Sequence, residues 1–154
     1  MKIKIADAED IEEILSLQKI AYISEAEIYN DFTIPPLIQT LDEIKDEYKS
    51  KVFIKAVAQN KIIGSVRARK IDSKTCYIGK LIVHPNYQNQ GIGSKLMDEI
   101  EKYFKDCNGY ELITGHNSQK NLHIYQKRGY KLFKTEKLTD DLNLVYLEKT
   151  KNES

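Results

Sequence analysis

Two glycines lie between a buried strand and an amphipathic helix, and this junction constrains the fold more than any other feature of the chain. The apolar run 76–83 (CYIGKLIV) predicts a buried strand, with Gly79 at its centre as a site for a bulge or a close approach. Apolar residues then recur at helical spacing over 92–104, and a short apolar run follows at 110–114. A strand–helix–strand unit is a crossover connection, so we expect these two strands to be parallel.

The rest of the chain alternates between the two-residue period of strands and the 3.6-residue period of helices. Further strands are expected at 2–5, 52–58, 62–69, 130–137 and 142–148, and further helices at 11–21, 40–50 and 119–128. Thr40 and Glu43 form a capping box at the start of one helix. The two adjacent prolines within 24–36 lead us to expect an irregular connection there, and Arg67 is expected to point outward from its strand. This order predicts a mixed α/β fold, with one domain over 1–148 and a short polar tail at 149–154.

Composition and charge exclude several classes of protein. Lys plus Arg is 24 and Asp plus Glu is 23, so the net charge of +1 gives no reason to expect a nucleic acid or an anionic membrane as partner. No apolar run approaches the roughly 18 residues that span a bilayer, and the first ten residues lack the apolar core of a signal peptide. Cys76 and Cys107 fit neither a metal-binding nor a redox pattern, so we expect no metal and a reducing, cytoplasmic location.

The charge is unevenly distributed along the chain. Residues 1–50 carry 5 Lys/Arg against 12 Asp/Glu, and the excess of positive charge lies in the remainder. The acidic residues either complement helix starts and solvated faces or form a region that binds a cationic ligand.

Gly91 and Gly93, at the strand–helix junction, are suited to binding an anion. Glycine permits positive φ and a close approach of backbone N–H groups to a ligand at the positive end of the helix dipole. A P-loop is excluded because the next residues are Ser94-Lys95, in the wrong order and without a glycine at the required distance before them. A dinucleotide fingerprint is excluded because its third glycine would be at the position of Leu96. What remains is the pattern Gln88-x-x-Gly91-x-Gly93.

This pattern resembles the phosphate-binding signature of the GNAT superfamily, the acyl-CoA-dependent N-acetyltransferases. A second segment, 121–130 (NLHIYQKRGY), is similar to another block of that family, in which a tyrosine lies four residues before a Gly-aromatic pair. The resemblance covers residues 1–148 and is weakest over 22–50. It implies a GNAT-like fold: a central mixed, mostly antiparallel sheet with one splayed pair of parallel strands, and about four helices.

The resemblance also implies acetyl-CoA (CoA) as cosubstrate and direct attack of an amine on its thioester. The implied cofactor-binding residues are Leu81, Ile82, Val83 and Asn121 for the pantetheine arm, and Gln88, Asn89, Gln90, Gly91, Ile92, Gly93, Ser94 and Lys95 for the pyrophosphate. Tyr125 is the implied proton donor to the departing thiolate. The alternatives are a core aromatic for Tyr125 and a helix cap or an exposed side chain for Asn121.

A proton acceptor for the substrate amine is needed, because an alkyl amine has a pKa of about 10 and arrives protonated. Some relatives carry a glutamate just before the pantetheine-binding edge, whereas the segment 77–80 (YIGK) has no carboxylate. The candidates are His116, which is equally an exposed loop histidine, and Glu25 or Glu27. We expect His84 and His123 to be structural.

The family builds its acceptor site from the two early helices and their connection. The resemblance therefore implies that the substrate is bound by Tyr22, Glu25, Tyr29, Asp31 and Phe32, since aromatic rings and carboxylates suit an ammonium. Packing of these aromatic rings against the sheet is the alternative. The expected function is transfer of an acetyl group to a primary amine of a small molecule or peptide, with a catalytically inactive CoA-binding regulatory module as the alternative. A homodimer is compatible with the long terminal strands.

Overall fold

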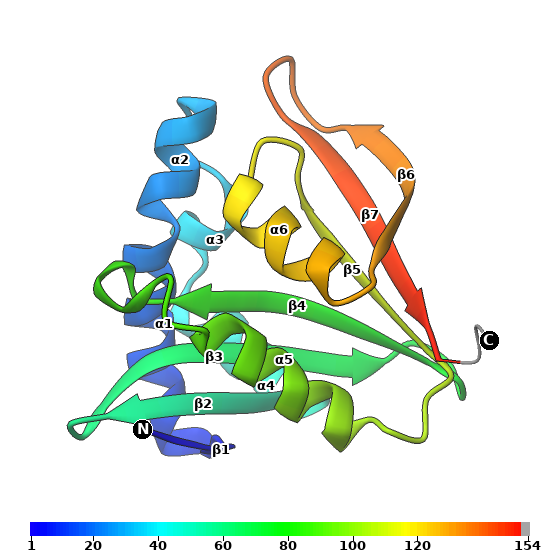
Figure 1. Ribbon diagram of the computed structural model, residues 1–154. Helices are drawn as coiled ribbons and strands as arrows, with labels where there is room; N and C mark the ends of the chain where they lie inside the picture. Colours follow the sequence, from blue (N-terminus) through cyan, green and yellow to red (C-terminus); the bar gives the residue numbers. More distant parts are fainter. Residues whose placement is uncertain (152–154) are drawn as a thin grey trace.

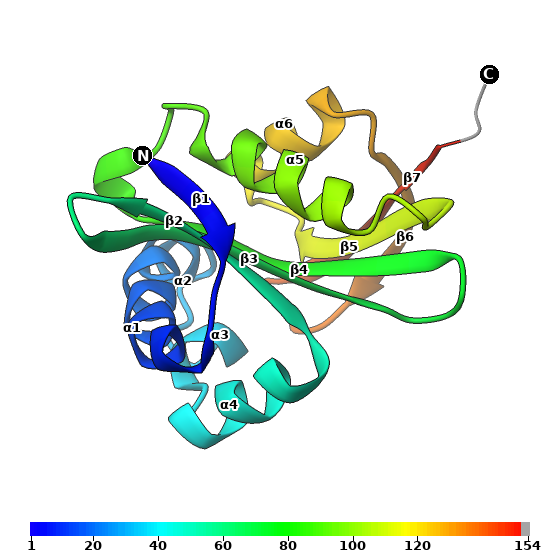
Figure 2. The same cartoon turned by 90° about the horizontal axis from the view of Figure 1, so that it is seen from below.

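The computed structural model describes residues 1–151, in which a seven-stranded mixed sheet is covered by helices on both faces (Figures 1 and 2). The strand order is β1-β2-β3-β4-β5-β7-β6. The strands are β1 (Lys2–Ile5), β2 (Val52–Ala58), β3 (Lys61–Lys70), β4 (Thr75–Val83), β5 (Gly109–Gly115), β6 (Lys131–Lys137) and β7 (Asn143–Thr150). β4 and β5 are parallel and the other neighbours are antiparallel, which confirms the predicted mixed sheet and its parallel pair.

Helices of the first half of the chain cover one face of the sheet, and the two later helices cover the other (Figure 2). The helices are α1 (Ile11–Ala21), α2 (Ile23–Tyr29), α3 (Pro35–Ile38), α4 (Leu41–Ser50), α5 (Ile92–Tyr103) and α6 (Gln119–Lys127), with short 3-10 turns η1 (Ala8–Asp10) and η2 (Pro85–Tyr87). Each face has its own apolar core, one around α5 and the other around α1 and α4. The sheet thus separates two apolar layers.

Local signals determine several of the helix starts. The capping box predicted at Thr40 is present: its side chain accepts from the N–H of Glu43, and the Glu43 carboxylate accepts from the N–H of Thr40. A second capping box joins Asp7 and Asp10 ahead of α1. These caps satisfy backbone N–H groups that have no partner within a helix.

The expectation of an irregular connection over 24–36 is wrong. Most of its first half is α2, which buries Ala26 and Tyr29 and ends at Asn30 in the left-handed conformation (φ 50°). The prolines begin the short helix α3, since Pro35 occupies its first position, where a missing N–H costs nothing. The four helices expected from sequence are therefore joined by two short ones.

The expectation that Arg67 points outward is also wrong. Its side chain does lie on the opposite face of the sheet from the α5 core, as the alternation predicts, but α1 and α4 cover that face, and the residue is only 2% exposed.

At the carboxyl terminus β7 extends to Thr150, so the first two residues of the predicted tail belong to the sheet. Residues 152–154 of that tail lie outside the described residues.

A bulge interrupts the pairing of β3 with β4. Val66 pairs with Leu81 and Ala68 pairs with Ile78, so Arg67 lies opposite two residues, Gly79 and Lys80. The peptide bond between these two residues is cis. The bulge lies at the glycine where the sequence predicted one.

Within residues 1–151, no helix has the length and apolar character needed to cross a membrane. The same part of the chain contains no group of three or more His, Cys, Asp or Glu side chains that could hold a metal ion.

Candidate functional site

β4 and β5 pair over only part of their length, and this creates the framework of the site. Thr75–Ile78 of β4 pairs with Gly109–Leu112 of β5, and beyond that point the two strands diverge (Figure 1). On its other side β4 remains paired with β3 through Leu81, Ile82 and Val83. The edge of β4 that faces β5 is therefore open at these three residues, and it offers backbone groups to an extended ligand.

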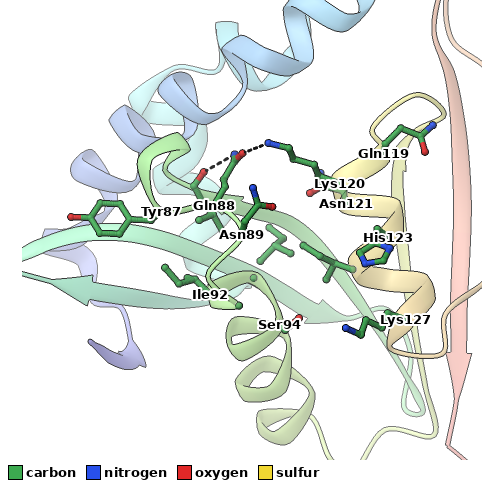
Figure 3. A pocket seen from close by; sticks show the side chains of 15 residues that line it. Tyr87, Gln88, Asn89, Ile92, Ser94, Gln119, Lys120, Asn121, His123 and Lys127 are labelled. Atoms are coloured by element: carbon green, nitrogen blue, oxygen red, sulfur yellow. Dashed lines mark hydrogen bonds between the residues drawn. The ribbon is translucent and has the colours of Figure 1, made fainter.

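A cavity of about 560 Å³ lies between this open edge, the start of α5 and one face of α6 (Figure 3). α5 begins at Gly91, whose φ of +78° is accessible mainly to glycine. No side chain caps this helix, so the N–H groups of Ile92, Gly93 and Ser94 at its positive end are not bonded by a cap. The geometry is that of an anion-binding site at a helix start.

The second glycine of the pattern has a different role. A Cβ added at Gly93 would lie 3.1 Å from Cδ1 of Ile124 on α6. Gly93 therefore allows α5 and α6 to approach closely, and this contact forms the floor of the cavity. At Gly91 an added Cβ would meet no atom within 4 Å, so only its backbone conformation requires glycine.

α6 contributes polar and cationic side chains to the cavity wall. Lys120, Asn121, His123 and Lys127 line it (Figure 3). The ammonium of Lys120 donates to Oε1 of Gln88 at 2.7 Å, and Nε2 of Gln88 lies 3.5 Å from the carbonyl oxygen of Val83. Gln88 thus joins the loop before α5 to β4 on one side and to α6 on the other. Lys120 and Lys127 increase the attraction of this cavity for an anion.

A second cavity, of about 380 Å³, adjoins the first, and the residues that line both are Leu81, Val83, Gln88, Gln119, Lys120 and Asn121. Its opposite wall comes from α1 and α2 and includes Tyr22, Glu25 and Ile28. Because the two cavities meet at the open edge of β4, ligands in the two cavities would be in contact there.

Glu25 is the carboxylate that faces this second cavity. Burial raises its pKa above the usual range, and a hydrogen bond donated by Ser118 Oγ partly opposes that rise. Ser118 is itself buried and immediately precedes α6. A carboxylate of raised pKa is a stronger proton acceptor once it is ionised.

Tyr125 lies on α6 with its side chain buried, and its ring centroid is 6.0 Å from that of Tyr130. Within the described chain its hydroxyl has no hydrogen-bond partner. Burial raises its pKa, and the neighbouring Tyr22, Tyr77 and Glu25 raise it further. The phenol therefore stays protonated and is free to donate a hydrogen bond.

The structure brings most of the sequence-predicted cofactor residues to these cavities. Leu81, Val83, Gln88, Asn89, Gly91, Ile92, Gly93, Ser94 and Asn121 line the larger one, and Ile82 lines the smaller one. Gln90 and Lys95 are exposed and line neither cavity. The side chain of Lys95 is therefore an unsuitable ligand for an anion at the helix start. Tyr125, which is buried, lines neither cavity either.

Only two of the residues predicted for the acceptor, Tyr22 and Glu25, line the second cavity. Tyr29 is buried behind it, where its hydroxyl contacts Ser118 and accepts from the N–H of Asn117. The carboxylate of Asp31 accepts from its neighbour Thr33, and Phe32 is 54% exposed. Because 23–29 is a helix and not a loop, only one of its faces can point into the cavity, and the residues that follow it point away.

His116 is not brought to either cavity. Its Nδ1 accepts from the N–H of Asn143 at 2.9 Å, and its ring packs 5.6 Å from that of Tyr29. The histidine therefore ties the end of β5 to the start of β7, which leaves Glu25 as the better placed of the two residues predicted as base. Glu27, the alternative glutamate, is exposed on α2.

Sequence reasoning assigned Asn121 and Tyr125 of α6 to the site but missed three other side chains of this helix. Lys120, His123 and Lys127 recur at spacings of three and four residues, so they share one helical face, and this spacing could have identified them. The expectation that His123 is only structural does not fit its place in the cavity wall. Ser118 carried no sequence signal, because its role depends on a partner 93 residues away in the chain.

Comparison with known proteins gives a consistent picture. The family model described as acetyltransferase (GNAT) family matches residues 11–130. The UPF0157 protein YqkA of Bacillus subtilis is 29% identical over 132 residues, which cover 86% of this chain but only 38% of that protein. Among solved structures, smu.2055 of Streptococcus mutans has a TM-score of 0.83 with 18% identity, covering 99% of this chain and 100% of that one. The paia N-acetyltransferase of Thermoplasma acidophilum, in complex with coenzyme A, has a TM-score of 0.79 with 22% identity, covering 97% and 99%.

Proposed function

The chain belongs to the GNAT acetyltransferase family, and on this basis we propose that it transfers an acetyl group from acetyl-CoA to a primary amine of a small molecule or peptide. One observation carries the proposal. The cavity with the uncapped helix start and the cavity with Glu25 meet at the open edge of β4. An acyl donor and an amine could therefore react directly, in a ternary complex.

The residues of the larger cavity fit a CoA molecule. The N–H groups from Gly91 to Ser94 suit its diphosphate, because they have no capping side chain and lie at the positive end of α5. Lys120 and Lys127 add positive charge from the opposite wall. The open edge of β4 suits the pantetheine arm, whose amides pair like those of a strand. When bound, acetyl-CoA supplies the activated thioester.

In the acceptor cavity, Glu25 is suited to removing a proton from the incoming ammonium, directly or through water. Its raised pKa makes it a better base than an exposed carboxylate, and Tyr22 beside it suits a cationic group. N–H groups on the edge of β4 near Ile82 can stabilise negative charge that develops on the acyl oxygen. Tyr125 is suited to donating a proton to the departing thiolate, because its hydroxyl is protonated and has no partner among the described residues.

The second candidate function is a catalytically inactive module that binds CoA and signals its presence. It is favoured by Lys80, which occupies the part of β4 where some relatives carry a glutamate. Such a module would keep the larger cavity and would need no base in the smaller one.

Two measurements test the proposal. Acetyl-CoA should raise the melting temperature, because a ligand at about 100 times its dissociation constant adds about 2.7 kcal/mol to the unfolding free energy. Mass-resolved assay of a mixed pool of polyamines, amino sugars, amino acids and peptides should then reveal acetylated products. A thermal shift without transfer to any amine would favour the inactive module, and the absence of any shift would exclude both functions.

A further inference from the structure

The acceptor cavity has a single carboxylate in its wall, although the first third of the chain is acidic. Residues 1–50 carry 12 Asp/Glu, and of the acidic side chains within residues 1–151 only Glu25 lines this cavity. Several of the others are bonded elsewhere: Asp7 and Glu43 belong to capping boxes, and Glu13 accepts from the N–H of Ile62 at 2.6 Å. The acidic segment therefore complements helix starts and backbone groups, and it presents one negative charge to an acceptor.

Apolar side chains flank this carboxylate. The helical path continues from α1 into α2, because the N–H of Ala26 donates to the carbonyl oxygen of Tyr22 at 2.9 Å. Tyr22 lies one turn before Glu25 and Ile28 lies one turn after it, so the three share a helical face, and all three line the cavity. β4 lines it too, with the apolar run 81–83. Hydrocarbon surface thus surrounds the only negative charge of the wall.

Ile28 is the most exposed of these apolar side chains. It is 48% exposed although it lines a cavity. Single exposed isoleucines are common on protein surfaces, but this one lies one turn from the carboxylate that faces the acceptor. A ligand that covers it with hydrocarbon removes apolar surface from water on both sides of the contact. A charged or hydrated group placed there would lose water and gain no partner.

The remaining charge in the wall of the acceptor cavity is positive. Lys120 lines it, and its ammonium donates to Oε1 of Gln88 at 2.7 Å. A second ammonium on the acceptor would meet this cation, and the part of the chain that the structure describes places no second carboxylate in the wall. The volume of about 380 Å³ is near the lower end of the range for small-molecule sites, roughly 300–1,000 Å³. Size and charge therefore both suit a small monocation.

We propose that the acceptor is a small monoamine whose ammonium pairs with Glu25 and whose hydrocarbon body contacts Ile28 and Tyr22, and that Ile28 determines this specificity. The inference rests on the proposed function, because it assigns a substrate class to the same acceptor cavity. One carboxylate within an apolar wall selects against polyamines and amino sugars, since their further ammonium or hydroxyl groups would be desolvated against hydrocarbon.

The test uses acceptors that differ only at the end away from the reacting amine. A series of n-alkylamines from ethylamine to hexylamine is compared with α,ω-diamines in which an amino group replaces the terminal methyl group. In the wild-type protein, kcat/KM should rise by about fourfold for each methylene that the apolar wall covers. Each diamine should be at least about tenfold poorer than the matching monoamine. An amino sugar and a tripeptide, tested beside them, should be at least about tenfold poorer than the best alkylamine.

Variants at position 28 then assign the preference to one residue. Ile28→Glu places a second carboxylate one turn from Glu25, so it should lower the ratio of kcat/KM for monoamines over diamines by about tenfold or more. Ile28→Ala should weaken the dependence on chain length. The matched controls are Ile20→Glu and Ile20→Ala, because Ile20 is 47% exposed on α1 and lines neither cavity. Both controls should keep the wild-type pattern. A thermal shift with CoA, equal in all variants, shows that each is folded.

The possible outcomes separate this inference from the proposed function. A diamine, amino sugar or peptide that is acetylated as efficiently as the best alkylamine would overturn the inference and leave the acetyltransferase proposal standing. An unchanged ratio in Ile28→Glu, or an equal change in Ile20→Glu, would overturn the role of Ile28. A CoA thermal shift without transfer to any acceptor would overturn both proposals.

Discussion

The hydroxyl of Ser118, just ahead of α6, donates a hydrogen bond to the carboxylate of Glu25 on α2. A serine hydroxyl has one proton, so the contact of 3.2 Å between the Oγ of Ser118 and the hydroxyl of Tyr29 must be donated by the tyrosine. Tyr29 in turn accepts from the N–H of Asn117 at 2.8 Å. This chain of hydrogen bonds fixes the carboxylate at the wall that α1, α2 and α6 share, and it joins the acceptor side of the site to the helix that holds Tyr125.

Replacing Ser118 by Ala should shift the pH dependence of the reaction. The hydrogen bond from Ser118 lowers the pKa of Glu25, so its removal should raise that pKa further above the usual range. A base must be ionised, and the acidic limb of kcat/KM should therefore move to higher pH. We also expect a loss of about 1 kcal/mol in unfolding free energy. Ser16→Ala, on the exposed face of α1, is the control, and an unmoved acidic limb in Ser118→Ala would exclude Glu25 as the titrating group.

Glu25→Gln should reduce kcat by about 100- to 10,000-fold, the usual contribution of a positioned general base. CoA affinity should stay the same, because Glu25 does not line the larger cavity. In the wild type the rate should fall as pH decreases through the raised pKa of Glu25, and this limb should be absent from the variant. The matched control is Glu27→Gln, which removes the same charge from the exposed face of α2. Equal activity of the two variants would contradict the assignment.

Tyr125→Phe should separate catalysis from stability. The residue Tyr125 is buried, but its hydroxyl oxygen is not among the fully buried polar atoms that lack a partner. The hydroxyl forms no hydrogen bond within residues 1–151, so its removal leaves no other group unsatisfied, and the unfolding free energy should change by less than about 1 kcal/mol. Turnover should fall by about 100-fold if the hydroxyl protonates the thiolate, with CoA affinity nearly unchanged. Chemical denaturation and steady-state kinetics on the same preparation measure both effects. Undiminished turnover would show that Tyr125 is a core aromatic residue and not the proton donor.

The sequence predicted the β4–loop–α5 junction well because its signals are local. Gly91 has a conformation that few residues other than glycine adopt, and Thr40 with Glu43 forms a cap within a single turn. The bulge of β4 was likewise indicated by Gly79, a residue in the bulge itself. Each of these features depends on residues within one turn or one loop, so the chain reveals it without tertiary information.

The parts that sequence reasoning missed depend on distant contacts. Arg67 alternates outward as its strand predicts, but the period of a strand does not say which face the early helices will cover. Histidine is a common catalytic residue type, but the Nδ1 of His116 already accepts a hydrogen bond from the N–H of Asn143. Phe32 was expected in the acceptor site because it lies in the connection between the two early helices and an aromatic ring suits an ammonium, but the structure places it after α2 with its side chain exposed.

Two substitutions at Gly91 should separate backbone strain from anion binding. An added Cβ meets no atom, so Gly91→Ala should cost only the left-handed conformation, about 1–2 kcal/mol, and should weaken CoA binding by less than about tenfold. Gly91→Asp places a carboxylate at the N–H groups that suit the diphosphate, and it should weaken binding by about 100-fold or more. Calorimetric titration with CoA distinguishes the two. Equal affinities would mean that the diphosphate binds elsewhere.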